Sequence, residues 1–579
     1  MKLVKITLSF LLVFFVSWQG FSQLDSTYNV EDHYTKQEVD IPMRDGVKLH
    51  TTIYSPRDTS QKYPILMQRT PYSSRPYGEG KMRSKIGPNE YLMQQGNIIV
   101  YQDVRGRWMS EGQYDNMRAY IPNKKGKQTD ESSDTYDTID WLVKHVKNNN
   151  GKVGTWGISY PGYYAVCSLI DAHPALKAVS PQAGISDFFF DDFHHNGAYL
   201  LSYWRATSLF GYQKTQPVDT AWYKFPDLPT KDQYQFFLDE GPLTNLDEYY
   251  KKDNIFWQQL KDHPNYDEFW KSRGILQYLN NVKPAVMVVG GLFDAEDLYG
   301  PFHEYKKIEK TGDNYNILVY GPWSHGQWAS SETRQSLGNI YFGDNISRNF
   351  QKNYETNFFN HFLKGDGSKN TDLAEAHVYD TGKREWDNYS AWPPKNVQEK
   401  KFFLGPDQSL TNEATDTKES FVSDPNKPVP YSEDIKMVFT PRKYMTDDQR
   451  FAARRPDVLV FETPVLDHDM KLSGPIKAAL EVATTGTAAD WVVKVIDVFP
   501  NDAEDYPETQ KYLKMDNYYM MVRSEVMRGR FRNSFEKPEP FEPNKKTNVT
   551  FDLQDINHTF KKGHKLQIQI QSTWFPLID

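Results

Sequence analysis

A serine flanked by two glycines, in the segment GTWGISYPG at residues 154–162, is the feature that most constrains how this chain folds. A short β-prone run precedes Ser159 and a helix-length apolar run follows at 163–170, so the serine falls on a sharp turn from strand to helix. Gly157 and Gly162 carry no Cβ atom, which lets the backbone crowd the serine. The pattern makes Ser159 the best candidate nucleophile, and an ordinary glycine- and serine-containing turn is the alternative interpretation.

Short β-rich runs recur up to residue 320 and are separated by helical patterns such as 135–145 (TYDTIDWLVKH). The predicted strands cover residues 38–42, 47–54, 64–68, 97–102, 176–180, 285–289 and 316–320. Strands that alternate with helices predict a parallel sheet with helices on both faces, which is an α/β core.

Two later segments depart from this alternation. Between 186 and 279 the chain carries aromatic and polar runs of helical character, and a βαβ unit needs only about 30 residues, so we expect an inserted helical cap that acts as a lid. From 371 to 579 the pattern predicts a β-sandwich with strands at 377–379, 401–404, 476–482, 491–498 and 549–553. The last run, 566–571 (LQIQIQ), is predicted to be a half-exposed strand.

The first residues have the composition of an export signal. Lys2 and Lys5 precede an apolar run at 6–18 that is too short to span a membrane, and small residues then precede Gln23. We predict a signal peptide over residues 1–22 and an exported protein that is periplasmic or secreted, with a buried N-terminal helix as the alternative. No later run has the length and apolarity of a membrane span.

Composition excludes some classes of protein and some sources of stability. The formal net charge is −8, which argues against nucleic-acid binding. Cys167 is the single cysteine, so no intramolecular disulfide can form and we predict that it is a small core residue. No spacing of His, Cys or acidic residues indicates a metal site, and no cofactor is expected.

Two predicted strands end in residues that could activate a serine. The strand at 285–289 leads into Asp294, and the strand at 316–320 leads into His325. Catalytic groups of a doubly wound sheet lie beyond the carboxyl ends of its strands, and the order Ser, Asp, His is that of α/β-hydrolases. Each residue has a plain alternative, a turn aspartate and a loop histidine, but their occurrence together in this order is more specific than either alone.

An acyl-transfer site also needs donors for the developing oxyanion. The backbone N–H of Tyr160 is one candidate, because it directly follows Ser159. The Tyr72 hydroxyl, in the loop after the strand at 64–68, is the other, and a packing role for Tyr72 is the alternative.

Five motifs together resemble the cocaine esterase and X-Pro dipeptidyl-peptidase family of serine hydrolases. They are RTPY at 69–72, YQDVRGRWMSEG at 101–112, GISYPG at 157–162, GLFDAED at 291–297 and GPWSH at 321–325. The resemblance implies an α/β-hydrolase core at 23–185 and 280–370, a helical cap at 186–279 and a jelly-roll sandwich at 371–579. It also implies that Ser159 is the nucleophile, Asp294 orients His325, His325 is the base, and Tyr72 with the Tyr160 amide forms the oxyanion hole.

Further carboxylates beside Asp294 narrow this resemblance. Glu296 and Asp297 follow it directly, and Asp192 stands at the start of the cap. The arrangement is similar to the α-amino acid ester hydrolases, in which an acidic cluster receives the substrate's α-ammonium group. Carboxylates crowded in a desolvated pocket repel one another and are relieved by a bound cation; a solvated acidic loop is the alternative.

The chain departs from those relatives in two places. Pro161 stands where a glutamate is expected after Ser159 and Tyr160, which puts the rim of the acyl pocket in doubt. Family members also continue past the segment 572–576, so we expect the last sandwich strands to be missing and an exposed strand edge near 566–570.

The leading hypothesis is therefore an exported serine hydrolase or acyltransferase that cleaves esters or amides of α-amino acids, β-lactams among them, through an acyl-enzyme on Ser159. X-Pro dipeptidyl-peptidase, general carboxylesterase and glutaryl acylase activities are the alternatives within the family. Glu296 and Asp297 argue against an anionic glutaryl side chain, since like charges repel. Outside catalysis, a peptide- or glycan-binding protein on a silent scaffold is the remaining alternative. Assembly as a homo-oligomer is a further expectation.

Overall fold

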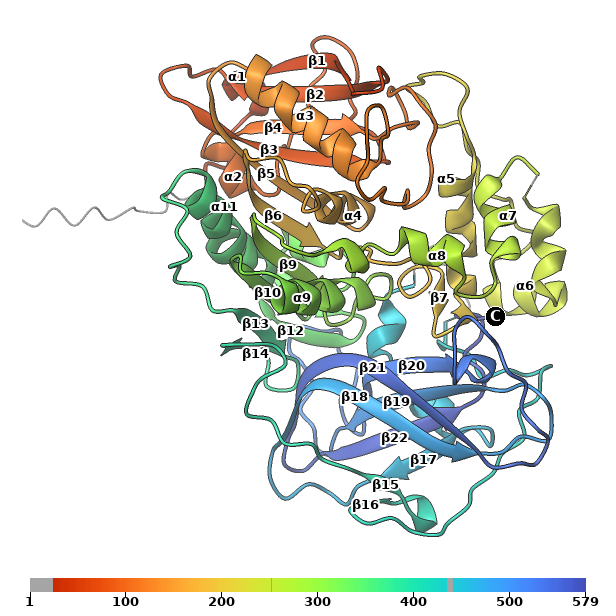
Figure 1. Cartoon of the computed structure of the whole chain (residues 1–579). Coiled ribbons are helices and arrows are strands. Elements are labelled where there is room, and N and C mark those ends of the chain that lie inside the picture. Colours follow the sequence, from red (N-terminus) through yellow and green to blue (C-terminus); the bar gives the residue numbers. More distant parts are fainter. Residues whose placement is uncertain (1–23, 251, 435–440) are drawn as a thin grey trace, which may run out of the picture.

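The computed structural model describes residues 24–250, 252–434 and 441–579, so the predicted signal peptide lies outside the described residues. A large mixed sheet with helices forms one part, a group of short helices lies beside it, and antiparallel strands form the opposite end (Figure 1). No helix in these described ranges combines the length and the apolarity that crossing a membrane requires.

The core sheet has its parallel strands at the centre. In the described part of the chain its order is β1 (Tyr34–Pro42), β2 (Lys48–Pro56), β4 (Ile98–Asp103), β3 (Tyr63–Thr70), β5 (Asn149–Ile158), β6 (Leu176–Gln182), β9 (Ala285–Gly291), β10 (Asn316–Gly321), β13 (Ala376–Asp380) and β14 (Glu385–Tyr389). Strands β4 to β13 run parallel, whereas β1, β2 and β14 pair antiparallel at the two edges. The predicted α/β core is confirmed.

Helices cover both faces of this sheet. Successive residues of a strand point to opposite faces, and on β5 a Cβ atom at Gly154 would contact α11 through Leu363, while the Thr155 hydroxyl bonds to Ser168 just after α4. The helices around the sheet are α1 (Val30–His33), α2 (Glu90–Gln94), α3 (Glu131–His145), α4 (Tyr160–Cys167), α9 (Tyr299–Thr311), α10 (Ile346–Asn349) and α11 (Thr356–Leu363), with a π-helical turn at Phe350–Glu355. Cys167 is buried at the end of α4, as predicted.

Between β6 and β9 the chain forms a separate group of short helices (Figure 1). They are a 3₁₀ helix η1 (Leu201–Ala206), α5 (Thr207–Gly211), α6 (Gln233–Glu240), η2 (Leu243–Glu248), α7 (Ile255–Asp262), α8 (Glu268–Arg273) and η3 (Leu276–Tyr278), preceded by the short hairpin β7 (His194–His195) and β8 (Ala198–Tyr199). Phe188, Phe193 and Phe210 of this segment pack on one another. Phe188 and Phe210 also pack on the ring of Tyr160, the residue that follows Ser159. The inserted segment thus contacts the start of α4.

The C-terminal part consists of antiparallel sheets with a shared apolar core. One sheet has the order β17 (Leu459–Glu462), β22 (Lys565–Gln571), β19 (Asp490–Val498) and β20 (Tyr519–Arg528), and the other pairs β18 (Met470–Val482) with β21 (Thr547–Phe560). Val495 of the first sheet and Leu553 of the second belong to the same buried cluster. Three smaller elements precede the C-terminal part, namely η4 (Gln327–Ala329), β11 (Arg334–Leu337) and β12 (Ile340–Asp344). Those within it are β15 (Phe403–Leu404), β16 (Leu410–Thr411), α12 (Arg450–Ala453) and the 3₁₀ turns η6 (Pro406–Gln408), η7 (Lys443–Thr446) and η8 (Gly529–Phe531). The jelly-roll topology and the domain boundaries stay predictions.

Two strand predictions were wrong. The run 377–379, assigned to the sandwich, is part of β13 and pairs with β10 in the core sheet, because its short apolar pattern fits either kind of sheet. The run 566–571 is neither half-exposed nor an edge. Its glutamines at 567, 569 and 571 are fully buried, and β22 lies between β17 and β19. The NH₂ groups of these amides donate to one another and to nearby groups instead of to water, as in the bond from Gln569 to Gln567, while the side-chain oxygens of Gln569 and Gln571 have no partner in the described chain.

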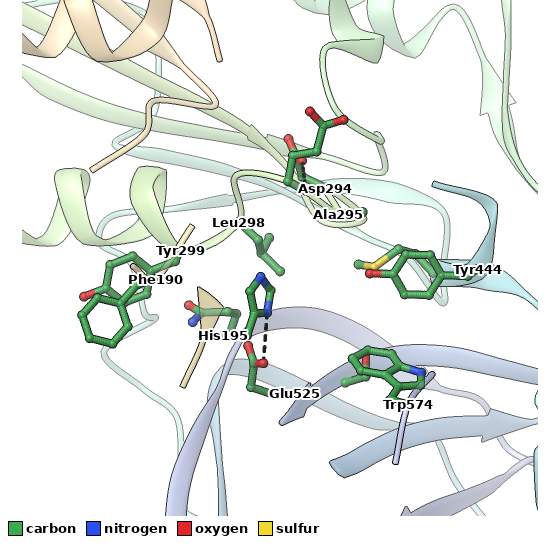
Figure 2. Close-up of a pocket in the computed structure, with 13 residues that line it drawn as sticks. Phe190, His195, Asp294, Ala295, Leu298, Tyr299, Tyr444, Glu525 and Trp574 are labelled. Atoms are coloured by element: carbon green, nitrogen blue, oxygen red, sulfur yellow. Dashed lines mark hydrogen bonds and ion pairs between the residues drawn. The ribbon is translucent and has the colours of Figure 1, made fainter. Parts of the chain in front are cut away.

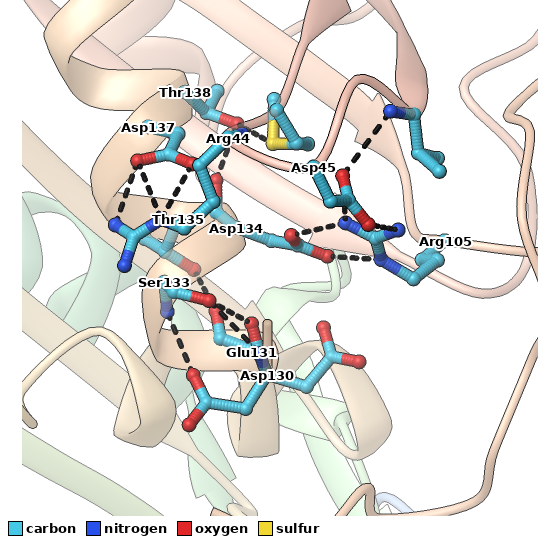
Figure 3. A network of polar contacts seen from close by, with 12 residues as sticks. Arg44, Asp45, Arg105, Asp130, Glu131, Ser133, Asp134, Thr135, Asp137 and Thr138 are labelled. Atoms are coloured by element: carbon cyan, nitrogen blue, oxygen red, sulfur yellow. Dashed lines mark hydrogen bonds and ion pairs between the residues drawn. The ribbon is translucent and has the colours of Figure 1, made fainter. Parts of the chain in front are cut away.

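A buried network of paired charges anchors α3 (Figure 3). Arg105 donates two hydrogen bonds to Asp134, of 2.9 and 2.7 Å, and a third of 2.7 Å to Asp45. Arg69 bonds to Glu131 at 3.0 Å, so both Asp134 and Glu131 face an arginine. The motif at 101–112, in which Arg105 stands, therefore holds the helix to the sheet.

Candidate active site

Ser159 lies on the predicted turn between β5 and α4. It is the N-cap of α4. Its φ of 68° and ψ of −131° define a backbone conformation with positive φ that residues other than glycine rarely adopt. A Cβ atom at Gly157 would collide with the carbonyl of Pro161, and one at Gly162 would lie 2.7 Å from the carbonyl oxygen of Gln182. The two glycines thus permit the tight turn that presents a half-buried Ser159 hydroxyl.

Asp294 and His325 meet beyond the ends of neighbouring strands, β9 and β10. His325 Nδ1 lies 3.1 and 3.0 Å from the two oxygens of Asp294, and the backbone N–H groups of Glu296 and Asp297 donate to the same carboxylate. The backbone N–H of Phe293 bonds to the carbonyl of Trp323 and joins the two loops. Burial alone would raise the pKa of Asp294, but His325 and these hydrogen bonds hold it below its ordinary value.

The other nitrogen of His325 faces Glu296. Its Nε2 lies 3.5 Å from Glu296 Oε2, and among the described residues no hydrogen bond joins Ser159 to the imidazole. Burial would lower the pKa of His325, but the charges of Asp294 and Glu296 outweigh it and raise the pKa to about 9. In this state the imidazole is a cation at neutral pH, held between two carboxylates.

Of the two candidate oxyanion donors, Tyr160 directly follows Ser159, and Tyr72 packs on Phe210, whose ring also packs on Tyr160. Tyr160 is the first residue of α4, so its backbone N–H has no acceptor within the helix and is open to a ligand. Tyr72 is 37% exposed and packs on Phe210. Desolvation of its hydroxyl, followed by the charge of Asp192, raises the pKa of Tyr72 well above its ordinary value, which keeps the hydroxyl a donor.

The predicted acidic residues form one buried cluster. Asp192, Glu296 and Asp297 are 3%, 6% and 0% exposed, and one oxygen of Asp192 and both of Asp297 have no hydrogen-bond partner in the described chain. Burial first, and then the charge of the neighbouring carboxylates, raises the pKa of Asp192 and Asp297 well above the usual range. The cluster is therefore short of positive charge. The adjacent Asp191 differs, because it accepts three backbone N–H bonds.

Two contacts of this cluster were not predicted from the sequence. The Tyr203 hydroxyl, on η1, donates to Glu296 Oε2 at 2.6 Å. Arg442, from the C-terminal part, approaches Glu296 Oε1 at 3.3 Å and remains 41% exposed. Neither residue lies in a motif or at a strand end, and only tertiary packing brings them here.

A small cavity of about 20 Å³ is lined in part by the loop that contains Asp294 and Ala295 (Figure 2). His195 of the inserted segment and Glu525 of β20 are paired at 3.1 Å on its far side, and Tyr444 and Trp574 close it. A water needs a space of roughly this size, so the cavity leaves no room for a substrate.

Comparison with known proteins identifies relatives along nearly the whole chain. Residues 45–327 match the family described as X-Pro dipeptidyl-peptidase (S15 family). Residues 368–579 match the X-Pro dipeptidyl-peptidase C-terminal non-catalytic domain. The second match covers the antiparallel sheets described above.

Individual relatives include esterases and peptidases. Cocaine esterase from Rhodococcus sp. (strain MB1 Bresler) is 25% identical, over 96% of this chain and 93% of its own length. An aminopeptidase from a marine sediment archaeon, Thaumarchaeota archaeon, is 34% identical with a TM-score of 0.86, covering 96% of this chain and 92% of its own. A selenomethionine-labelled α-amino acid ester hydrolase is 31% identical with a TM-score of 0.85, covering 99% and 94%.

Proposed function

Because the chain belongs to the X-Pro dipeptidyl-peptidase (S15) family of serine hydrolases, we propose that it cleaves esters or amides of α-amino acids through an acyl-enzyme on Ser159. The observation that carries this choice of substrate is the buried cluster of Asp192, Glu296 and Asp297 next to His325, in which one oxygen of Asp192 and both of Asp297 accept no hydrogen bond in the described chain. A substrate α-ammonium group would supply the positive charge that the cluster lacks.

Each residue has a defined role in the proposed reaction. Ser159 Oγ attacks the acyl carbon while His325 takes its proton, and Asp294 holds the imidazole by its Nδ1. The Tyr160 N–H and the Tyr72 hydroxyl bind the oxyanion. His325 then returns the proton to the leaving alcohol or amine, and water or another amine releases the aminoacyl group.

Substrate binding also prepares the base in this scheme. Glu296 pairs with His325 Nε2 in the empty site and keeps the imidazole protonated. An ammonium group bound to Glu296 neutralises part of that carboxylate charge and lowers the pKa of His325, so the imidazole releases its extra proton to solvent and Nε2 can accept the proton of Ser159. Substrates with an α-ammonium group would thereby gain in catalysis as well as in binding.

The test is to trap the acyl-enzyme. Phenylglycine methyl ester mixed with the enzyme and quenched in acid should add one phenylglycyl group to the peptide that contains Ser159, seen by mass spectrometry. Ser159→Ala should show no adduct and lose at least about 10⁴-fold in kcat. Turnover by Ser159→Ala at the wild-type rate would exclude this mechanism, and binding without turnover by wild type would leave a silent binding protein.

X-Pro dipeptidyl-peptidase activity is the second candidate, favoured by the family matches to residues 45–327 and 368–579. It too requires a free amino terminus, which the same cluster could bind. Parallel kcat/KM values for phenylalanyl-p-nitroanilide and alanyl-prolyl-p-nitroanilide separate the two, because the ammonium lies one residue farther from the scissile bond in the second substrate.

Export completes the proposal. Its support is the basic and apolar start of the sequence before Gln23. N-terminal sequencing of the protein recovered from a secreting bacterial host should begin at Gln23, and a protein that retains Met1 would contradict export by this signal.

A further inference from the structure

A second cavity, of about 210 Å³, lies where the core sheet meets the C-terminal sheets. It shares no lining residue with the site around Ser159. The turn between β13 and β14 contributes Thr381 and Arg384, and the opposite wall comes from the end of β19 and the turn between β21 and β22. A ligand here would touch both parts of the molecule.

Two cationic side chains line this cavity without an acidic partner. Among the described residues the ammonium group of Lys561 forms neither an ion pair nor a hydrogen bond, and Asp497, Asp469 and Asp380 act on it only from a distance. Arg384 reaches the carbonyl of Tyr341 at 3.5 Å and the ring of Tyr506 at 4.7 Å. Burial, and then the charge of Arg384, lowers the pKa of Lys561.

The carboxylates around this cavity already have other hydrogen-bond partners. Asp497 lies between two histidines, His558 at 3.1 Å and His564 at 2.8 Å. Asp380 accepts bonds from Thr559 and is paired with Lys471 at 3.3 Å. Glu504, on the rim, is exposed to solvent. Among the described residues, the side chains of Arg384 and Lys561 therefore have no carboxylate bonded directly to them inside the cavity.

We propose that this cavity binds a doubly charged oxyanion of the phosphate class between Arg384 and Lys561. Two cations facing one cavity match a dianion, and the planar guanidinium can donate two parallel bonds to it while the ammonium acts as a point charge. The bound anion bridges the core sheet and the C-terminal sheets, so it stabilises their junction.

The test uses inorganic phosphate and the thermal unfolding of the whole chain. The Tm should rise with phosphate concentration along a saturable binding curve, at ionic strength held constant with sodium chloride. Lys561→Ala should abolish the saturable rise, and Lys561→Arg should retain it. The matched control is Lys562→Ala, because Lys562 is the adjacent, exposed lysine and its contact with Asp469 is made through the backbone N–H.

Direct binding distinguishes the site from a general salt effect. Equilibrium dialysis with labelled phosphate should give one site per chain for wild type and Lys562→Ala and none for Lys561→Ala, while acetate at the same ionic strength should not compete. A rise in Tm that never saturates, or that is the same in Lys561→Ala, would overturn the proposal. If Lys561→Ala does not fold, Lys561→Gln provides the same comparison.

Discussion

The acids around α3 and the acidic cluster next to His325 are both buried, but the acids around α3 are hydrogen-bonded to arginines, whereas Asp297 and one oxygen of Asp192 accept no hydrogen bond in the described chain. Asp134 is fully buried and takes two hydrogen bonds from Arg105, which also binds Asp45 (Figure 3). Asp297 is also fully buried, yet neither of its oxygens accepts a hydrogen bond in the described chain. The same fold thus holds one aspartate in a satisfied network and leaves another unsatisfied.

This difference in hydrogen bonding indicates different roles for the two groups of buried carboxylates. A buried carboxylate without a partner destabilises the folded state, whereas pairing offsets much of the desolvation cost and makes removal of the partner strongly destabilising. Unpaired buried charge therefore points to a group that is completed by a ligand. On this account the α3 network supports the fold and the cluster of Asp192, Glu296 and Asp297 supports substrate binding.

The largest expected effect is the loss of stability when the paired network is broken. Asp134→Ala leaves Arg105 buried with Asp45 alone, and we expect the free energy of unfolding to fall by about 3–5 kcal/mol. Urea unfolding monitored by fluorescence measures it. Asp137→Ala on the same helix is the control, because its pair with Arg44 is more exposed and should contribute about 1 kcal/mol or less. Equal losses in both variants would contradict the distinction.

Asp297→Asn should stabilise the protein, whereas Asp134→Ala should destabilise it. The amide removes a buried charge, so we expect the free energy of unfolding to rise by about 1 kcal/mol. An aspartate with a raised folded pKa favours folding below its unfolded pKa of about 3.9, and this contribution is lost as pH rises through the folded pKa. The advantage of the variant should therefore grow from pH 4 to pH 8 in thermal unfolding. A variant less stable than wild type throughout would show that the Asp297 charge is compensated.

The pH dependence of catalysis sharpens the comparison further. Phenylacetic acid methyl ester has no amine to titrate, so the acid limb of its kcat/KM reports His325, which must lose its proton to act as the base. With the pKa raised to about 9, activity should climb with pH up to that region. Glu296→Gln removes the carboxylate near Nε2 and should move the limb down by about 1 unit. An unmoved limb would mean that Glu296 does not act on the base.

The smallest effect is expected at the rim of the cluster. Arg442 lowers the pKa of His325, so Arg442→Ala should move the same acid limb upward, by less than about 0.5 unit because solvent screens this exposed side chain. Lys443→Ala serves as the control, since Lys443 is paired with Asp447 rather than with the cluster. A shift of equal size in the control would assign the effect to the loop and not to the Arg442 charge.

Features that depend on the local sequence pattern could be predicted from the sequence, whereas features that depend on tertiary packing could not. Glycine spacing placed Ser159 on its turn, and the ends of two strands placed Asp294 and His325 together, because parallel strands bring their carboxyl ends to one edge. The strand at 377–379 was misassigned, since a short apolar run does not reveal which sheet it joins. Arg442 and Tyr203 could not be found, because no local pattern marks a residue delivered from another part of the chain.

The central claim is that the unpaired carboxylates exist to bind an ammonium group, and one comparison tests it most directly. The ratio of kcat/KM for phenylglycine methyl ester to that for phenylacetic acid methyl ester is measured for wild type, Asp297→Asn and Asp137→Asn, below the pKa of the substrate amine. We predict that the ratio strongly favours the amine in wild type and Asp137→Asn and falls by about 10–100-fold in Asp297→Asn, as expected for losing a charged hydrogen bond. A ratio that is the same in all three proteins would contradict the account and leave a general carboxylesterase with an acidic loop.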